Sequence, residues 1–356
     1  MAASLPVRIL AGRWETPAGH WIQSAAFDLA FFVLAPLVML PVTFGALHWH
    51  NAFALVGFVL AFAHYASSFT FYLWDENRAH HRARWGAFFA GPLLITATFC
   101  ALVIFRVPLI VQVVLFFWNA VHVSRQSCGI LSLYRHRAGV ADPREKRAAN
   151  GAILAVNLWF CLWNIETHAE VQPVLMAISK QLPLLLWLGS GVVAAGALAR
   201  ALATLWRRGS VGLPELGLFV ASLALFHPYL WIPDSARATF AMLLPHYVQY
   251  LGLVWLVHRR RVNDPSASRR PALLQQISAN LPGLVLTLAA IGLGLFALKE
   301  ALGRVGQLAL FEAAYLLIAF LHFYVDGLFW AFKDPHVRRT LGPYLMHGSP
   351  AASALR

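Results

Sequence analysis

The feature that most constrains this chain is a series of long apolar stretches separated by short charged segments. A helix that crosses a bilayer needs about 20 mainly apolar residues, since the hydrocarbon offers no water to its backbone groups. Of the 356 residues, 59% are hydrophobic and only 12% are charged, whereas a water-soluble domain keeps about a quarter of its residues charged. The sequence therefore predicts an all-α fold, namely a polytopic bundle of membrane-spanning helices.

About ten stretches are long enough to span a bilayer. We expect a cytoplasmic N-terminal segment over 1–24, the helix bundle over 25–332 and a cytoplasmic C-terminal tail over 333–356. The fifth stretch is short, and the seventh contains Glu215 and Pro228, so these two are the weakest of the expected spans. The expected spans are 25–47, 52–74, 87–106, 109–132, 150–166, 183–205, 212–231, 239–258, 279–298 and 308–332.

The arginine and lysine residues gather in alternate segments between the spans, such as 78–84 and 259–261. Cytoplasmic segments of membrane proteins carry such an excess of positive charge. We therefore expect a multi-pass protein of the cell inner membrane, with both termini in the cytoplasm and membrane lipids around it. The net charge of +13 follows from these helix ends, so no nucleic-acid partner is expected. The segments on the other side hold only Arg106, Lys180, Arg237, Lys299 and Arg304.

Four histidines interrupt the apolar stretches far from their ends: His64, His122, His246 and His322. Each stands about 10–12 residues before the basic end of its span, which at 1.5 Å per residue is roughly 15–18 Å, near the bilayer midplane. All four spans run in the same direction. We therefore expect the four imidazoles to lie at one depth, where they could converge inside the bundle and bind a metal ion.

Each of these histidines is followed, one helical turn later, by a polar residue on the same face. The four polar residues are Ser68, Gln126, Tyr250 and Asp326, and Gln249 extends the stripe beside Tyr250. Polar groups in hydrocarbon are costly, so the stripes should face the bundle interior. We expect Asp326 and Tyr250 to take part in catalysis, and Gln126 and Gln249 to line a cofactor site.

A buried carboxylate such as Asp326 needs a cation or a hydrogen-bond donor beside it. We expect a histidine, Arg125 or a metal ion in that place, with Asp326 either binding the metal or orienting an imidazole. Imidazole and carboxylate groups without thiolate suit iron, copper or zinc. Hydrolysis at the midplane would lack water, so the sequence favours iron, with a lipid or isoprenoid-like substrate and an electron donor as partners.

A second group of histidines lies near the cytoplasmic ends of the spans. Two of them follow Asp75 and Glu76 closely, and together these residues could form a dinuclear metal site. They could equally be solvated residues at the membrane surface. The group comprises His80, His81, His136, His258 and His336.

The histidine spacing also allows a haem. His122 and His136 are fourteen residues apart, as are His322 and His336, and this spacing resembles the histidine pairs that bind two stacked haems in b-type cytochromes. Pro335 should end the last helix before His336, which disfavours two haems. A single haem b at the midplane remains an alternative.

Isolated histidines within apolar helices resemble the membrane-embedded, histidine-ligated non-haem iron oxygenases. The bacterial carotene-cleaving dioxygenases are the nearer likeness. The fatty acid desaturases and alkane hydroxylases use HxxxH and HxxHH boxes, which are absent here, since the adjacent pair His80-His81 lacks the upstream spacing. The resemblance covers general architecture and implies an iron-dependent oxygenase.

Two other classes of protein compete with this interpretation. Glu312, His322 and Asp326 could form the proton relay of a proton-coupled transporter, although the sequence lacks an evident inverted repeat or pair of broken helices. A membrane scaffold without chemistry would leave the polar stripes unexplained. The sequence therefore favours a metal-dependent membrane oxidoreductase.

Overall fold

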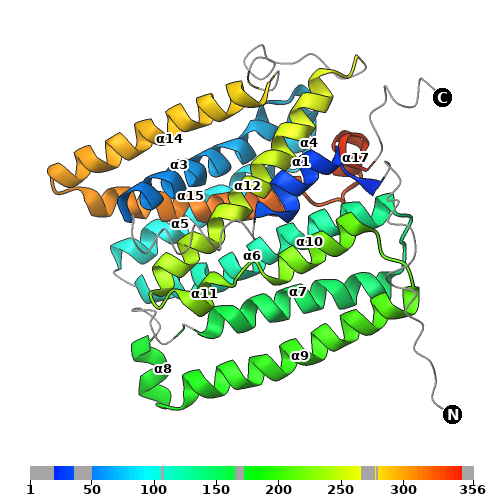
Figure 1. Ribbon diagram of the computed structural model, residues 1–356. Helices are drawn as coiled ribbons and strands as arrows, with labels where there is room; N and C mark the ends of the chain where they lie inside the picture. Colours follow the sequence, from blue (N-terminus) through cyan, green and yellow to red (C-terminus); the bar gives the residue numbers. More distant parts are fainter. Residues whose placement is uncertain are drawn as a thin grey trace.

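The computed structural model describes residues 20–35, 50–105, 108–163, 165, 172–265, 277 and 280–346, and its regular elements over these residues are all helices. The long helices are α3 (His50–Phe69), α5 (Gly91–Ile104), α6 (Pro108–Arg137), α7 (Pro143–Trp163), α9 (Leu182–Arg208), α10 (Leu213–Leu223), α12 (Ser235–Val262), α14 (Leu281–Arg304) and α15 (Leu308–Phe329). Figure 1 shows them lying side by side, with α14 at one edge of the bundle and α9 at the opposite edge.

Short elements connect or cap these helices. Proline at the first turn is compatible with a helix start but not with a helix interior, and Pro228 accordingly begins a separate helix within the seventh expected span. The short helices are α1 (Ala25–Asp28), α4 (Asp75–Ala83), α8 (Gln172–Ile178), α11 (Pro228–Trp231), α16 (Pro335–Thr340) and α17 (Gly342–Leu345), with single turns of other helix types at Leu29–Val33, Thr70–Leu73 and Gly86–Ala90.

Seven helical segments of the described part are long and apolar enough to cross a bilayer. They identify the chain as a membrane protein and coincide with seven of the expected spans. The expected spans in α6 and α7 are helical but more polar, and most of the first expected span lies outside the described residues. The seven are Leu55–Tyr72, Gly86–Ile104, Leu182–Arg208, Leu213–Trp231, Arg237–Val262, Leu281–Arg304 and Leu308–Phe329.

The helices differ in how much of their surface is covered. α12 is the most enclosed of the seven spans, with 83% of its apolar window buried. In contrast, α9 and α14 expose large apolar side chains such as Val192 and Leu286. Such surfaces are suited to lipid, because hydrocarbon is as apolar as leucine. A functional site that is buried inside the bundle is therefore expected around α12.

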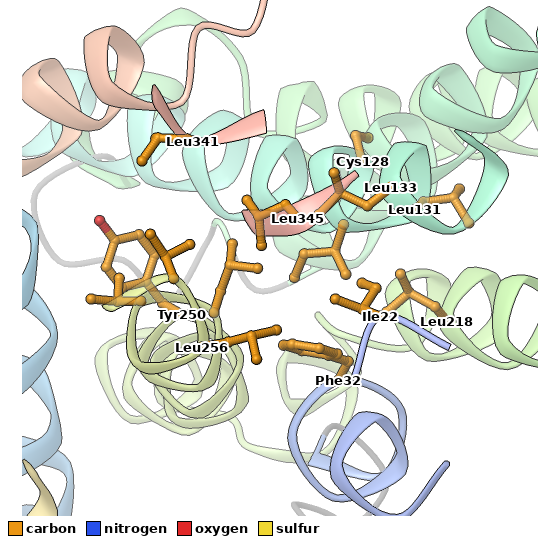
Figure 2. Close-up of a cluster of buried hydrophobic side chains, with 14 of the residues drawn as sticks. Ile22, Phe32, Cys128, Leu131, Leu133, Leu218, Tyr250, Leu256, Leu341 and Leu345 are labelled. Atoms are coloured by element: carbon orange, nitrogen blue, oxygen red, sulfur yellow. The ribbon is translucent and has the colours of Figure 1, made fainter. Parts of the chain in front are cut away.

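The two ends of the described chain pack into the bundle core. Figure 2 shows Phe32 close to Leu256 of α12, Ile22 close to Leu218 of α10, and Leu345 close to Leu133 of α6, all in one buried cluster. Part of each expected terminal segment, represented by Ile22 and Leu345, is thus buried. These contacts pack against the same helices, α6 and α12, that carry two of the four histidines.

A network of buried ion pairs ties together the ends of α6, α7, α9 and α10. Glu145 forms an ion pair with Arg135 at 3.0 Å and accepts a hydrogen bond from Arg208 at 2.7 Å. Glu215 accepts two hydrogen bonds from Arg208, at 2.7 and 3.0 Å, and lies 3.7 Å from Nε of Arg135. Two arginines and two glutamates alternate, so each charge is neutralised. This pairing explains how the seventh expected span accommodates Glu215.

Candidate metal centre

Four central helices bring the four midplane histidines to one point. α3 supplies His64, α6 supplies His122, α12 supplies His246 and α15 supplies His322. One possible ligand atom from each lies within 4.8 Å of the corresponding atoms of the other three, and this is the one group of its kind in the described part of the chain. The convergence expected from their common depth is therefore present.

The four imidazoles form a closed ring of contacts. The ring centroid of His64 lies 4.7 Å from that of His246 and 4.2 Å from that of His322. His122 completes the ring, at 5.2 Å from His246 and 5.0 Å from His322. Neighbouring rings meet edge to face, so that several nitrogens face a shared centre rather than another ring.

Most of the inward nitrogens have no hydrogen-bond partner. Among the described residues, both ring nitrogens of His64 and of His246 are buried without a partner, and so are Nε2 of His122 and Nε2 of His322. Buried polar atoms are nearly always hydrogen-bonded, because an unsatisfied group costs about 1–3 kcal/mol. These unsatisfied nitrogens could be satisfied by a bound group with positive charge or donor capacity.

The geometry fits one metal ion. An ion bound at about 2.0–2.1 Å by four imidazole nitrogens holds them roughly 3–4 Å apart. Donor atoms that already lie within 4.8 Å of one another need only small ring rotations to reach such distances. The donor set is imidazole alone, which suits iron, copper or zinc equally well.

A hydrogen-bonded chain anchors one of the four imidazoles. Nδ1 of His322 lies 2.8 Å from Oγ of Ser68, which lies 2.6 Å from the hydroxyl of Tyr250. The Tyr250 hydroxyl donates to Oδ1 of Asp326 at 2.6 Å and accepts from Nε1 of Trp330 at 3.2 Å. All five side chains belong to α3, α12, α15 and the residue that follows α15.

The direction of these bonds bears on the tautomer of His322. With Asp326 ionised and Ser68 donating to Tyr250, the oxygen of Ser68 accepts from Nδ1–H of His322. In this tautomer Nε2 of His322 carries the lone pair that a metal ligand requires. Nε2 lies 3.6 Å from Oδ2 of Asp326.

Of the partners expected for Asp326, the structure places a histidine beside it and not Arg125. It accepts from Tyr250 and lies beside His322, while Arg125 is exposed on α6 and forms no ion pair with it in the described structure. Asp326 and Tyr250 are both buried and adjoin the histidine cluster. In this geometry they hold an imidazole in place, which favours the orienting role for Asp326.

The two glutamines lie beside the cluster but bind backbone groups. Nε2 of Gln249 donates to the carbonyl of Phe32 at 2.8 Å. Nε2 of Gln126 donates to the carbonyl of His246 at 3.0 Å and approaches Oε1 of Gln249 at 3.4 Å. These amides link α6 and α12 to the N-terminal segment. The structure thus places them as supports of the helix that carries His246.

Three aromatic residues beside the cluster, Tyr65, Tyr247 and Trp330, were not predicted as site residues. Tyr247 and Tyr250 lie 4.8 and 4.4 Å from the His64 ring, and Tyr65 lies 5.1 Å from His322. Trp330 follows α15 directly and donates to Tyr250. Tyrosine clustered next to histidine in three apolar spans could have been noticed, but only the fold shows that the rings meet.

The histidines near the basic ends of the spans do not form a second cluster of this kind in the described structure. The rings of His80 and His336 stack in parallel at 4.0 Å, and His336 bonds to Asn77 at 2.9 Å. Glu76 forms an ion pair with Arg261 instead of joining them, and His258 bonds to Thr70, the residue that follows α3. His136 is exposed at the end of α6, and the side chain of Asp75 lies outside the described residues.

Burial sets the protonation of these peripheral histidines. Burial, together with the neighbouring His80 and His336, lowers the pKa of His81 to about 4. Burial also lowers the pKa of His80, against the opposing effect of Asp334. The pKa of His336 is lowered in the same way. These imidazoles are therefore neutral at physiological pH. His80 packs against Phe88, and His81 packs against Phe88 and Phe329.

Comparison with known proteins adds nothing to this picture: no protein-family model, curated protein or solved structure matches the chain. The geometry of the histidine cluster is therefore the basis for a functional conclusion.

Proposed function

We propose that this chain is an oxidoreductase of the cell inner membrane that uses one iron ion bound by His64, His122, His246 and His322. It would cross the membrane about ten times, with both termini in the cytoplasm, and act on a lipid or isoprenoid-like substrate. The observation that carries the proposal is the convergence of four buried imidazoles, most of whose inward nitrogens lack hydrogen-bond partners.

A single ion accounts for the ring spacing better than a haem does. Centroid separations of 4.2–5.2 Å around the cluster leave room for an ion but not for a porphyrin, which would have to pass between the rings. Copper fits the same donor set. Bound iron would supply activation of dioxygen, which suits a dry, apolar site better than hydrolysis does.

The protein residues around the ion would have separate tasks. Ser68, Tyr250 and Asp326 keep the lone pair of His322 Nε2 directed at the centre. Outer-shell partners of this kind orient ligands and raise their basicity. Buried aromatic rings around His64 exclude water, and this protects a reactive site from side reactions.

The proton-relay alternative lacks a continuous path in the described structure. Glu312 is exposed on α15, whereas His322 and Asp326 are buried. Proton transfer between buried groups needs hydrogen-bonded contact, and among the described residues no hydrogen bond joins Glu312 to the cluster. The oxidoreductase is therefore the better-supported function.

The test is metal and optical analysis of the purified protein beside the variants His246→Ala and His322→Ala. We expect iron in an equimolar amount in the wild type and loss of most of it in both variants. His258→Ala is the matched control, because His258 is a buried histidine of the same helix as His246 and bonds to Thr70 instead. It should keep its iron.

The absence of iron, copper and haem from the wild type would overturn the proposal. So would equimolar zinc, which cannot carry out redox chemistry. Uptake or release of protons in proteoliposomes that is unaffected by metal removal would support the transporter instead.

A further inference from the structure

A pocket of about 450 Å³ lies beside the end of α15, and none of its lining residues belongs to the histidine cluster. It is bounded by the end of α4, the end of α15 and the segment that leads to α16, and its lining includes Arg84, Gly327, Lys333 and Asp334. Small-molecule sites in proteins have volumes of about 300–1,000 Å³. This pocket, which we call the α4–α15 pocket, is therefore large enough for a ligand.

The pocket lies where the apolar spans end. Arg84 stands two residues before the span Gly86–Ile104, and Lys333 stands four residues after the span Leu308–Phe329. Trp85, between Arg84 and the first of these spans, is 59% exposed, and tryptophan is enriched where hydrocarbon meets the lipid headgroups. The α4–α15 pocket is therefore at the level of the headgroups.

The lining of the pocket carries a net positive charge. Arg84 and Lys333 are cations, whereas Asp334 is the single carboxylate among the lining residues. That carboxylate is already engaged, because it forms an ion pair with Arg84 and accepts from the backbone N–H of His336 at 2.8 Å. Lys333 is exposed and has no ion pair among the described residues. The pocket therefore attracts an anion.

Arg84 is held at the pocket with hydrogen-bond donors to spare. Its side chain is 46% exposed although it pairs with Asp334. A guanidinium has five N–H donors in one plane, and among the described residues the side chain of Arg84 donates only to Asp334, from Nη1. Asp334 thus fixes the position of the guanidinium, and the remaining donors are available to a ligand.

An apolar surface continues from the pocket into the hydrocarbon. Trp85, Phe89 and Leu93 follow one another at intervals of four residues, which places them on one side of the helical segment, and all three are exposed. The span to which Phe89 and Leu93 belong faces lipid over most of its surface, since only 11% of its apolar window is buried. An acyl chain can therefore lie along this side, starting next to Arg84.

We propose that the α4–α15 pocket binds the headgroup of an anionic phospholipid, with the phosphate between Arg84 and Lys333 and an acyl chain along Trp85, Phe89 and Leu93. Basic pockets between spanning helices bind acidic lipid headgroups at this level. A guanidinium binds a phosphate through two parallel hydrogen bonds, and an ammonium binds it as a point charge.

A lipid suits the pocket better than a soluble phosphate compound does. Gly327, Leu328 and Ala331 form an apolar side of the pocket. The glycerol carbons and the first methylenes of a lipid would cover this side, whereas a free phosphate ion would leave it without a partner. The lipid site does not require a metal ion in the histidine cluster.

The experiment is native mass spectrometry of the purified full-length protein with equal amounts of dioleoyl phosphatidylglycerol and dioleoyl phosphatidylethanolamine. The two lipids share their acyl chains and a phosphate, but only phosphatidylglycerol has a net negative charge. We expect one tight site for phosphatidylglycerol, with an affinity about fivefold or more above that for phosphatidylethanolamine, because basic residues near the headgroups attract anionic lipid.

Lys333→Gln should lower this preference about fivefold, since it removes one basic residue, whereas Lys333→Arg keeps the charge and should keep the preference. The matched control is Arg207→Gln, at an exposed arginine in the last turn of α9 that does not line the pocket. It should leave the tight site unchanged.

A second pair of variants tests the shape of the pocket. Gly327→Leu should abolish the tight site, because a leucine side chain at this lining position fills the pocket. Gly196→Leu on α9 is its control, since Gly196 is likewise exposed and has no atom within 4 Å of where a Cβ would stand.

Equal binding of the two lipids by the wild type would overturn the proposal. So would a preference that Lys333→Gln leaves unchanged, or one that Lys333→Arg loses to the same extent as Lys333→Gln. Displacement of phosphatidylglycerol by millimolar inorganic phosphate would assign the pocket to a soluble phosphate compound and overturn the lipid.

Discussion

The hydroxyl of Ser68 lies 2.8 Å from Nδ1 of His322, although Ser68 and His322 belong to different helices, α3 and α15. Ser68 is one turn after His64 on α3, yet it supports the histidine of another helix. His64 itself has no hydrogen-bond partner at either nitrogen. A residue of one helix therefore holds a histidine of another helix in place. A substitution on the first helix should change how the histidine on the second helix binds.

Removal of the Ser68 hydroxyl should weaken metal binding without unfolding the protein. Ser68→Ala leaves Nδ1 of His322 without its partner, and loss of such an orienting bond lowers metal affinity about 10–100-fold. Ser67→Ala is the control, because the Ser67 hydroxyl bonds to the carbonyl of His64 on its own helix. Competition with a chelator, read out by metal analysis, measures the difference. Equal iron retention by the two variants would contradict the anchoring role of Ser68.

Breaking the buried ion-pair network should destabilise the bundle strongly. Glu215→Ala leaves Arg208 and Arg135 with one carboxylate between them, and removal of one partner from a buried pair costs about 3–5 kcal/mol. Glu300→Ala removes an exposed pair with Lys299, which should cost less than about 1 kcal/mol. Thermal unfolding in detergent, followed by circular dichroism, compares the two. A similar Tm for both variants would show that the network contributes little.

Acid should destabilise the contact between α4 and the end of α15, where His81 packs against Phe329. The pKa of His81 is about 4 because of burial and the charges of His80 and His336, whereas an unfolded histidine titrates near 6.5. A lowered folded-state pKa means that the neutral form is stabilised. This stabilisation is complete above about pH 6.5 and declines as the pH falls toward about 4.

The Tm should therefore be lower at about pH 5 than at about pH 7.5, by the equivalent of on the order of 1–2 kcal/mol. His81→Phe should flatten this dependence, since Tyr72, Phe88 and Phe329 surround the ring. His136→Gln changes an exposed histidine at the end of α6 and should leave the dependence intact. A pH profile that His81→Phe does not alter would assign the effect to other groups.

The sequence predicts the helices and the meeting of the histidines, because both follow from one-dimensional spacing. Apolar length determines α9, α14 and α15 within a few residues. A common distance from the basic helix ends places His64 and His246 at one depth. These features depend on one helix at a time, so no knowledge of packing is required.

Features that depend on the rotation of one helix against another could not be predicted. Gln126 and Asp326 share a face with His122 and His322 respectively, but one binds a backbone carbonyl and the other a tyrosine. Glu76 was a possible ligand of a second metal site on the basis of its neighbours in the sequence, but in the structure it forms an ion pair with Arg261. The number of spans and their orientation remain predictions, because the described helices alone do not determine them.

The four histidines of the cluster span more than two-thirds of the chain, from His64 on an early helix to His322 on the last long one. If the helices enter the membrane one after another during synthesis, the cluster is complete only when α15 has entered. Any ion that needs all four imidazoles would have to be loaded after synthesis is nearly finished. Truncated or stalled chains would be inserted and apolar, yet unable to bind such an ion.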